Sequence, residues 1–303
     1  MKFLMFADLH YAPGVFMGGT WEDLKLLQQR AEEENCDFII HAGDFCHDVD
    51  KATDYIKAYN DFHIPSYHCL GNHDCDGTSY QETLKAYNMP NGYYFFDCKG
   101  YRFIIFDPNY CLLDGKYVHY DNGNYFATPE ARDHVPPEQL SWLRETISAS
   151  PYPCVLISHE SIEREGNAIK NKKALLEIIN NANQEQPGKV LLVINGHYHR
   201  DNLRILDGVC YWDVNSASFD WLRNTHDLYP EELRKEIYYM NHIVVYDDPL
   251  YAIVTLQGNT IQIEGCKSSM FMGITREMTG NEPLDLDGRP ATPVIQSARI
   301  TLG

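Results

Sequence analysis

Five short apolar runs in this sequence each end in residues that can bind a metal ion or transfer a proton. The runs span residues 3–7, 38–42, 66–70, 154–158 and 190–195. Because they are short and lack polar alternation, they predict strands that are buried on both faces of a sheet. Helix signals lie between them, and alternation of strands with helices is typical of an α/β fold.

The residues directly after these runs are rich in aspartate, histidine, asparagine and glycine. In chain order they are Asp8-Leu9-His10, Gly43-Asp44, Gly71-Asn72-His73-Asp74, His159 and Gly196-His197-Tyr198-His199. Each group alone is compatible with an ordinary turn or a core histidine. In open α/β sheets, however, ligand-binding groups gather outside the carboxyl ends of the strands. Five such groups at corresponding strand ends therefore predict one functional site at one edge of the fold.

Helix starts are visible between the apolar runs. Thr20 followed by Asp23 marks one start. Thr78 with Gln81 has the capping-box pattern and predicts a second. The stretch 136–147 opens with prolines, which favour a helix entry, and predicts a third.

The remaining apolar segments look antiparallel. Residues 93–107 contain a hairpin signal around Lys99-Gly100, and residues 242–265 are typical of two or three strands. No repeat or low-complexity linker divides the chain, so we expect one domain over residues 1–303 with a β-rich C-terminal portion at about 243–303. The segment 280–293, rich in Pro, Gly and Asp, is expected to be an ordered or semi-ordered wrap.

The composition excludes several classes of protein. A chain of 303 residues with 44% hydrophobic residues can fill a sizeable core. The N-terminal apolar run is too short for a signal peptide, and no run is long enough to cross a membrane, so we expect neither a targeting segment nor a membrane partner. Nine cysteines without a C-x-x-C pair indicate a reducing cytoplasm. The net charge of −18 argues against long nucleic acid as a partner.

The order D-x-H, G-D, G-N-H-D, H and G-H-x-H resembles the signature of the calcineurin-like metallophosphoesterase family. All five blocks are present between residues 8 and 199, which is about two-thirds of the chain. The resemblance implies an α/β fold in which two mixed β-sheets pack face to face with flanking helices. It also implies a hydrolase of phosphate esters.

A pair of metal ions is part of what the resemblance implies. Asp8, His10, Asp44 and His199 would hold the first ion, and Asp44, Asn72, His159 and His197 the second, with Asp44 bridging. Imidazole and carboxylate donors without thiolates suit divalent or trivalent transition-metal ions: Mn, Fe, Zn, Ni or Co. Two divalent ions carry more charge than two aspartates cancel. The excess would deprotonate a bridging water and attract a phosphate, and the neutral amide of Asn72 preserves it.

His73 is the expected catalytic residue. It is absent from the implied ligand set, but it follows Asn72 and so lies at the rim of the same site. It would stabilise the phosphoryl oxygens or protonate the departing alkoxide while the bridging hydroxide attacks in line. Asp74 would either orient His73 or simply end the loop, and the sequence leaves both open.

Substrate contacts would come from loops beside the strand ends. The candidates are Tyr11, Asn109, Tyr110, Tyr125 and Tyr198. An aromatic platform for a nucleobase is one interpretation of these tyrosines, and core or hairpin packing is the other. The segment 214–221 resembles a stretch that follows the G-H-x-H block in bacterial members of the family.

Departures from known branches of the family narrow the substrate. Asp48 and Leu70 stand where Ser/Thr protein phosphatases place arginines, so the site lacks their bidentate grip on a phosphoprotein. His47 stands where purple acid phosphatases place an iron-binding tyrosine. The pattern is closer to the bacterial phosphodiesterase branch, although the S-H-E-S around His159 lacks a proline often found there.

We therefore expect a cytoplasmic dimetal hydrolase of small phosphodiesters or phosphomonoesters. Two alternatives belong to other classes. A non-catalytic scaffold with the same fold is disfavoured by the complete ligand set, and a nuclease is disfavoured by the acidic charge balance. The sequence predicts no oligomeric state.

Overall fold

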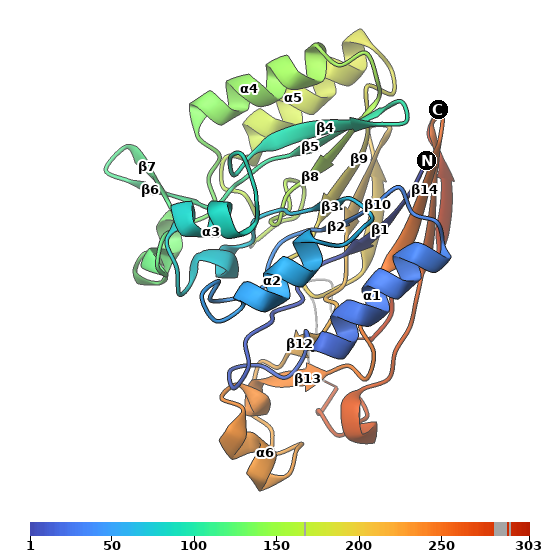
Figure 1. The fold of residues 1–303 in the computed structure, drawn as a ribbon. Helices are drawn as coiled ribbons and strands as arrows, with labels where there is room; N and C mark the ends of the chain where they lie inside the picture. Colours follow the sequence, from blue (N-terminus) through green and yellow to red (C-terminus); the bar gives the residue numbers. More distant parts are fainter. Residues whose placement is uncertain (167, 282–289, 291) are drawn as a thin grey trace.

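Two six-stranded β-sheets form the centre of the computed structural model (Figure 1), which describes residues 1–166, 168–281, 290 and 292–303. The first sheet has the order β16-β15-β14-β1-β2-β3 and the second β10-β11-β9-β8-β5-β4. The first consists of β1 (Lys2–Phe6), β2 (Phe38–His41), β3 (Ser66–Tyr67), β14 (Ala252–Gln257), β15 (Thr260–Gly265) and β16 (Ala298–Thr301). The second consists of β4 (Tyr94–Cys98), β5 (Tyr101–Ile105), β8 (Cys154–Ile157), β9 (Val190–Asn195), β10 (Asn202–Leu206) and β11 (Val209–Asp213).

Both sheets are mixed. In the first, β1, β2 and β3 are parallel, and β14 pairs with β1 antiparallel. In the second, β5, β8, β9 and β11 are parallel, and the edge strands β4 and β10 are antiparallel. Two small two-stranded antiparallel sheets lie outside this centre: β6 (Tyr110–Leu113) with β7 (Lys116–His119), and β12 (Phe219–Trp221) with β13 (Ile243–Val245).

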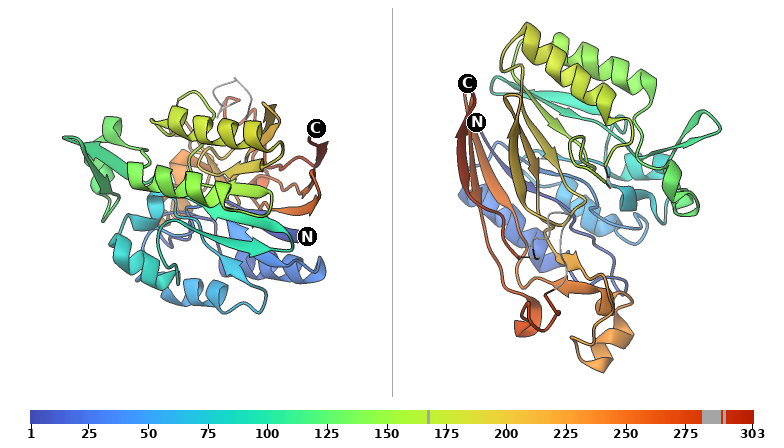
Figure 2. Two further views of the ribbon diagram at one scale, coloured as in Figure 1. Left: turned by 90° about the horizontal axis from the view of Figure 1, so that it is seen from above. Right: turned by 180° about the vertical axis from the view of Figure 1, so that it is seen from behind.

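Helices cover the outer face of each sheet (Figure 2). They are α1 (Trp21–Glu33), α2 (Thr53–Asn60), α3 (Tyr80–Ala86), α4 (Pro137–Ser148), α5 (Lys172–Glu185) and the peripheral α6 (Glu231–Glu236). Figure 2 shows α4 and α5 on one side of the paired sheets and α1 and α2 on the other. The predicted fold, two mixed sheets face to face with flanking helices, is confirmed.

Alternation along the strands explains this layering. In β1, Phe3 and Met5 belong to the core between the sheets, whereas Leu4 and Phe6 belong to the core beneath α1 and α2. The ring of Phe3 packs edge-on against Phe103 of the second sheet, with centroids 5.4 Å apart. Because successive side chains point to opposite faces, a strand buried on both faces is apolar throughout.

Four of the five predicted buried runs form strands of nearly the predicted length, and the third is shorter. β3 covers only Ser66–Tyr67, because the chain leaves the ladder with β2 at residue 68. Side-chain donors replace the strand partners there: the hydroxyl of Tyr94 donates to the carbonyl of His68, and the amide of Asn109 donates to the carbonyl of Leu70. A buried carbonyl needs such a partner once it leaves a sheet.

The predicted helix starts and the predicted hairpin are present, and one helix start lies one residue later than predicted. Thr20 caps α1 through the box with Asp23. The cap of α3 is Ser79 with Glu82, one residue later than the predicted Thr78–Gln81 pair, because the hydroxyl of Thr78 accepts the backbone N–H of Val49 instead. α4 begins with Pro137 as expected, and β4 and β5 form the predicted hairpin with positive φ at its two turn residues.

The C-terminal segments divide between two sheets. The predicted strands in 242–265 are β13, β14 and β15, of which the last two join the first sheet beside β1. Most of the predicted wrap at 280–293 lies outside the described residues. No helix in the described part of the chain combines the length and apolar character that a membrane crossing needs.

Candidate metal centre

The structure brings the seven predicted metal-binding side chains together at one edge of the two sheets. They come from loops after β1, β2 and β3 of the first sheet and after β8 and β9 of the second: Asp8, His10, Asp44, Asn72, His159, His197 and His199. All except half-buried His197 are buried. Their role as metal ligands remains a prediction. The distances between their donor atoms show whether the side chains lie close enough to share metal ions.

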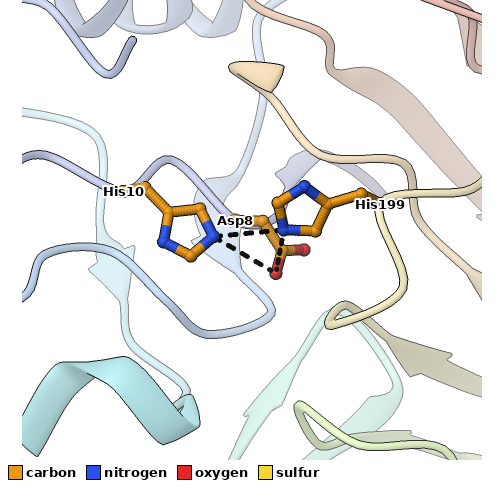
Figure 3. Close-up of side chains that lie close together, drawn as sticks. All are labelled: Asp8, His10 and His199. Carbon is orange, nitrogen blue, oxygen red and sulfur yellow. Dashed lines mark hydrogen bonds and ion pairs between the residues drawn. The ribbon is translucent and has the colours of Figure 1, made fainter. Parts of the chain in front are cut away.

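The first group of donors surrounds Asp8 (Figure 3). His10 Nε2 lies 3.1 Å from His199 Nε2, and His199 Nε2 lies 3.4 Å from Asp8 Oδ1. His10 Nε2 lies 4.0 Å from the same carboxylate oxygen and 3.7 Å from Asp44 Oδ2. Four donor atoms at these separations match the predicted set for the first ion.

The second group surrounds the amide oxygen of Asn72. This oxygen lies 3.1 Å from His159 Nε2 and 3.0 Å from His197 Nδ1. Asp44 Oδ2 lies 3.1 Å from His159 Nε2, so one carboxylate oxygen of Asp44 is close to both groups. The bridging position predicted for Asp44 agrees with this placement.

Backbone carbonyls fix the orientation of two of these histidines. His159 Nδ1 lies 2.7 Å from the carbonyl oxygen of Ala42, and His199 Nδ1 lies 2.7 Å from that of Phe219. A carbonyl only accepts, so each Nδ1 carries the proton. In the neutral ring, Nε2 then presents a lone pair toward the centre, as in many metal-bound histidines.

A side-chain relay fixes the orientation of His10. Asp76 Oδ2 lies 3.0 Å from His47 Nδ1, and His47 Nε2 lies 2.8 Å from His10 Nδ1. Because Asp76 accepts the His47 proton, His47 Nε2 accepts from His10 Nδ1, and His10 Nε2 presents a lone pair. Burial lowers the pKa of His10 well below its usual value, which keeps this ring neutral.

Converging lone pairs and carboxylates fit a cation. His10 Nε2 and His199 Nε2 face each other beside two buried aspartates, and no proton lies between them in the neutral tautomers. Burial lowers the pKa of His159, but the nearby carboxylates, Asp44 first and then Asp8 and Glu160, together outweigh burial and raise it well above its usual value. A proton and a metal ion therefore compete for the same place. The donor set, imidazole and oxygen without thiolate, suits transition-metal ions.

The backbone at the site is unusual. Positive φ values, between 52° and 71°, occur at five of the seven residues: Asp8, His10, Asp44, His197 and His199. Non-glycine residues rarely adopt this conformation, and such residues cluster at functional sites. The glycines permit close approach: a Cβ on Gly71 would lie 2.2 Å from Asp44 Oδ1, and one on Gly196 would lie 2.8 Å from Asp8 Oδ2.

His73 lies beside the metal-binding groups, paired with a carboxylate that the sequence did not single out. Its backbone N–H donates to Asp44 Oδ1 at 2.8 Å, and its Nδ1 lies 2.6 Å from Asp76 Oδ2. Burial lowers the pKa of His73, but the carboxylates of Asp44 and Asp76 outweigh burial and raise it. Nδ1 is therefore held by Asp76, and Nε2 is the nitrogen that can serve a substrate.

Asp74 has a different role from orienting His73. Its carboxylate accepts backbone N–H groups of Gly71 at 2.7 Å and of Asp44 at 3.0 Å, and the hydroxyl of Tyr87 at 2.6 Å. It thereby ties the G-N-H-D loop to the G-D loop. Of the two interpretations of Asp74, the loop-forming one agrees with the structure.

The segment 214–221 supports the site from behind. The hydroxyls of Ser216 and Ser218 both donate to the backbone carbonyl of Asp8, each at 3.0 Å. Phe219 supplies the carbonyl that orients one of the histidines, as described above. The segment therefore holds the backbone of Asp8 in place.

One substrate-side candidate touches the centre. The hydroxyl of Tyr125 lies 3.4 Å from Asn72 Nδ2 and 3.3 Å from His73 Nδ1. Asn109 is buried, and its amide bonds the carbonyl of Leu70, so it supports the loop before the G-N-H-D block.

The other tyrosine candidates contact aromatic or charged neighbours. Tyr11 stacks on Tyr55 with centroids 3.9 Å apart. The guanidinium of Arg164 lies 4.3 Å from the ring centroid of Tyr198. Tyr110 is half-buried in β6. None of these contacts tests a role in substrate binding, which stays a prediction.

The sequence did not indicate a role for Asp76 or the contact between His47 and His10. Asp76 follows His73 by three residues just after a short 3₁₀ turn (Asn72–Cys75), where residues three apart lie on the same side. The three-residue spacing could therefore have predicted the pairing of Asp76 with His73. The contact of His47 with His10 joins two loops and had no local signal.

Comparison with known proteins assigns the family. Residues 1–201 match the family model described as calcineurin-like phosphoesterase. The match covers more than half of the chain, so the chain belongs to the calcineurin-like phosphoesterase family. It is accordingly a metallophosphoesterase, a metal-dependent hydrolase of phosphate esters, as the sequence predicted. No curated protein matches the sequence.

Solved structures with the same fold are distant in sequence. A dimetal phosphatase from Danio rerio has 15% identity and a TM-score of 0.62, with 87% of this chain and 95% of that chain covered. GAP50, the anchor in the inner membrane complex of Plasmodium, has 14% identity and a TM-score of 0.56, with 100% and 89% covered. PhoD has 13% identity and a TM-score of 0.53, with 99% and 68% covered. At these identities the likeness concerns the fold.

Proposed function

We propose that this metallophosphoesterase hydrolyses small phosphodiesters or phosphomonoesters in the cytoplasm, with two transition-metal ions and with His73 as the acid for the leaving group. The observation that carries the proposal is the position of His73, which bonds the bridging carboxylate of Asp44 through its backbone and Asp76 through its ring. A histidine in this position can contact a phosphate ester that is bound at the metal centre.

The metal ions would be held by the residues of the two groups described above. Asp8, His10, Asp44 and His199 would hold one ion, and Asp44, Asn72, His159 and His197 the other. Bound ions of this kind supply Lewis acidity and lower the pKa of water. Mn, Fe, Zn, Ni and Co are all compatible with these donors.

The protein's own groups would orient the substrate and move one proton. His73 would hold a proton at Nε2 and deliver it to the departing oxygen, while Asp76 holds Nδ1 at 2.6 Å. Asp44 and Asp76 together raise the pKa of His73 against the effect of burial, which favours the protonated ring that an acid requires. The hydroxyl of Tyr125 donates to Asp76 Oδ1 at 2.6 Å and so holds this carboxylate in place.

The charges around the site support a substrate other than a phosphoprotein. A cavity of about 300 Å³ lies next to the His47–Asp76 pair, and Tyr11 and Lys51 also line it. Asp48, where protein phosphatases carry an arginine, pairs with Lys51 at 2.8 Å instead of offering a cationic fork. All nine cysteines are free, which supports the proposed cytoplasmic location.

Two other functions compete with this proposal. The first is a non-catalytic scaffold: the fold is shared with an anchor protein as well as with a dimetal phosphatase, so the fold alone does not separate the two functions. A nuclease is opposed by the net charge of −18.

A panel of esters tests the proposal directly. Purified protein supplemented with Mn²⁺ would be assayed on bis-nitrophenyl phosphate, nitrophenyl phosphate, alkyl and cyclic-nucleotide esters, a phosphopeptide and single-stranded DNA. We expect turnover of one or more small esters that chelator abolishes. Preference for the phosphopeptide or DNA would overturn the substrate class, and metal-free protein without turnover would favour the scaffold.

A further inference from the structure

Glu160 is a buried carboxylate next to the metal centre that the proposed reaction does not use. It follows His159 directly and has no solvent exposure. Within the part of the chain that the structure describes, neither of its side-chain oxygens has a hydrogen-bond partner. Buried polar groups almost always have partners, and an exception of this kind needs an explanation.

Neither protonation state of Glu160 is satisfied by the described residues. An ionised carboxylate in the interior needs a cation or several donors, because burial of an unpaired charge is costly. A protonated carboxyl would carry an O–H donor, which would need an acceptor. Since neither oxygen has a hydrogen-bond partner in another residue of the described part of the chain, protonation alone does not resolve the problem.

The position of Glu160 points to what would satisfy it. One of its carboxylate oxygens, a ring nitrogen of His159 and a ring nitrogen of His197 all lie within 4.8 Å of one another. These are the two histidines of the second predicted metal set. Donor atoms at such separations can share one cation.

The backbone of Glu160 is held firmly in this place. Its carbonyl accepts the hydroxyl of Ser158 at 2.9 Å and the amide of Asn195 at 2.9 Å. The same amide donates to the carbonyl of Ser158 at 3.1 Å. Asn195 is the last residue of β9, so the sheet itself fixes the turn that carries Glu160.

We propose that Glu160 is an additional ligand of the second metal ion, joining Asp44, Asn72, His159 and His197. The inference rests on the proposed dimetal centre and specifies its composition. A third carboxylate adds one negative charge to those of Asp8 and Asp44, and carboxylate oxygen favours harder ions. The site of the second metal ion should therefore bind Mn²⁺ or iron in preference to softer metal ions.

Three variants of the full chain test this assignment. Glu160→Leu removes the donor, and Glu160→Gln keeps the size and one neutral oxygen. Glu165→Gln is the matched control, because that glutamate lies in the same loop and its side chain is 98% exposed. Mn²⁺ binding would be measured by calorimetry and by electron paramagnetic resonance, and the metal-free proteins would be compared by thermal unfolding.

We expect wild type and Glu165→Gln to bind two Mn²⁺ ions per chain. Glu160→Leu should bind the second ion at least about 10-fold more weakly, with Glu160→Gln between it and wild type. The first ion should be unaffected. The metal-free Glu160→Leu protein should unfold no earlier than wild type, because the variant removes a buried carboxyl group that has no hydrogen-bond partner among the described residues.

Contrary outcomes separate this inference from the proposed function. Two ions bound with wild-type affinity in both Glu160 variants would overturn the ligand assignment alone, and Glu160 would then bond only buried water. A wild-type protein that binds no metal would overturn the dimetal centre and this inference together. If Glu160→Leu does not fold, the comparison of Glu160→Gln with wild type decides the question.

Discussion

Asp76→Asn should weaken catalysis most for substrates with a poor leaving group. Asp76 holds His73 Nδ1 at 2.6 Å and His47 Nδ1 at 3.0 Å, and the substitution removes its charge at nearly constant size. A hydrogen bond to a charged group contributes about 1.5 to 3 kcal/mol, and 1.4 kcal/mol corresponds to about tenfold in rate. The expected loss in kcat/KM is therefore about 10-fold to 10²-fold on an alkyl ester.

The leaving group separates acid catalysis from other roles. Nitrophenolate departs without a proton, whereas an alkoxide needs one, so Asp76→Asn and His73→Ala should both lose less on a nitrophenyl ester. On the alkyl ester, His73→Ala should lose about 10²-fold or more while retaining both metals. The double variant should lose less than the product of the two single losses, because Asp76 acts on the acid through His73; any loss beyond that of His73→Ala would measure its second contact, through His47 to His10. Asp50→Asn, an exposed carboxylate nearby, is the control.

The pH profile offers a second check on the same pair. Asp44 and Asp76 raise the pKa of His73, so the acid form persists to higher pH and activity falls as pH rises through that pKa. Asp76→Asn should move this alkaline limb to lower pH. Equal losses on both esters, multiplicative losses in the double variant or loss of metal from His73→Ala would each refute the reasoning.

Three further outcomes follow from the site geometry. Chelator should abolish activity, and Asp44→Asn should be the most damaging single ligand change because it removes the bridging charge; elemental analysis showing no metal with full activity in chelator would contradict this. Iron-loaded protein should lack an intense tyrosinate-to-iron band in the visible spectrum, because His47 stands at the tyrosine position. Gly71→Ala should lower stability by about 1 to 3 kcal/mol and weaken metal binding, because its Cβ would lie 2.2 Å from Asp44 Oδ1; unchanged unfolding and metal content would show that the loop adapts.

The sequence predicted the parts of this molecule that depend on local pattern. The apolar runs identified the central strands, since a strand buried on both faces has no polar alternation. The residues after those runs do converge, because parallel strands deliver their carboxyl ends to one edge. The extent of β3 was overestimated, since side chains such as Asn109 satisfy the backbone there in place of a strand partner.

Contacts between loops could not be predicted from the sequence. The relay from Asp76 through His47 to His10 joins residues up to 66 positions apart in sequence, through hydrogen bonds of 3.0 and 2.8 Å. Nothing in the local pattern around Glu160 indicates that its side chain turns inward. Such features depend on how loops pack, which one-dimensional periodicity does not encode.

The support of Asp8 and the first β-strand by the C-terminal third has a consequence for how the protein is made. The five signature blocks end at residue 199, yet β14 (Ala252–Gln257) pairs directly with β1, and Ser216 and Ser218 bond the carbonyl of Asp8. A nascent chain emerges from its N-terminus, so every signature residue is made before β14, one of the two strands that flank β1. The growing polypeptide thus contains all of its predicted metal donors before the segments that support Asp8 and β1 are made, and we expect the centre to be completed late in biosynthesis.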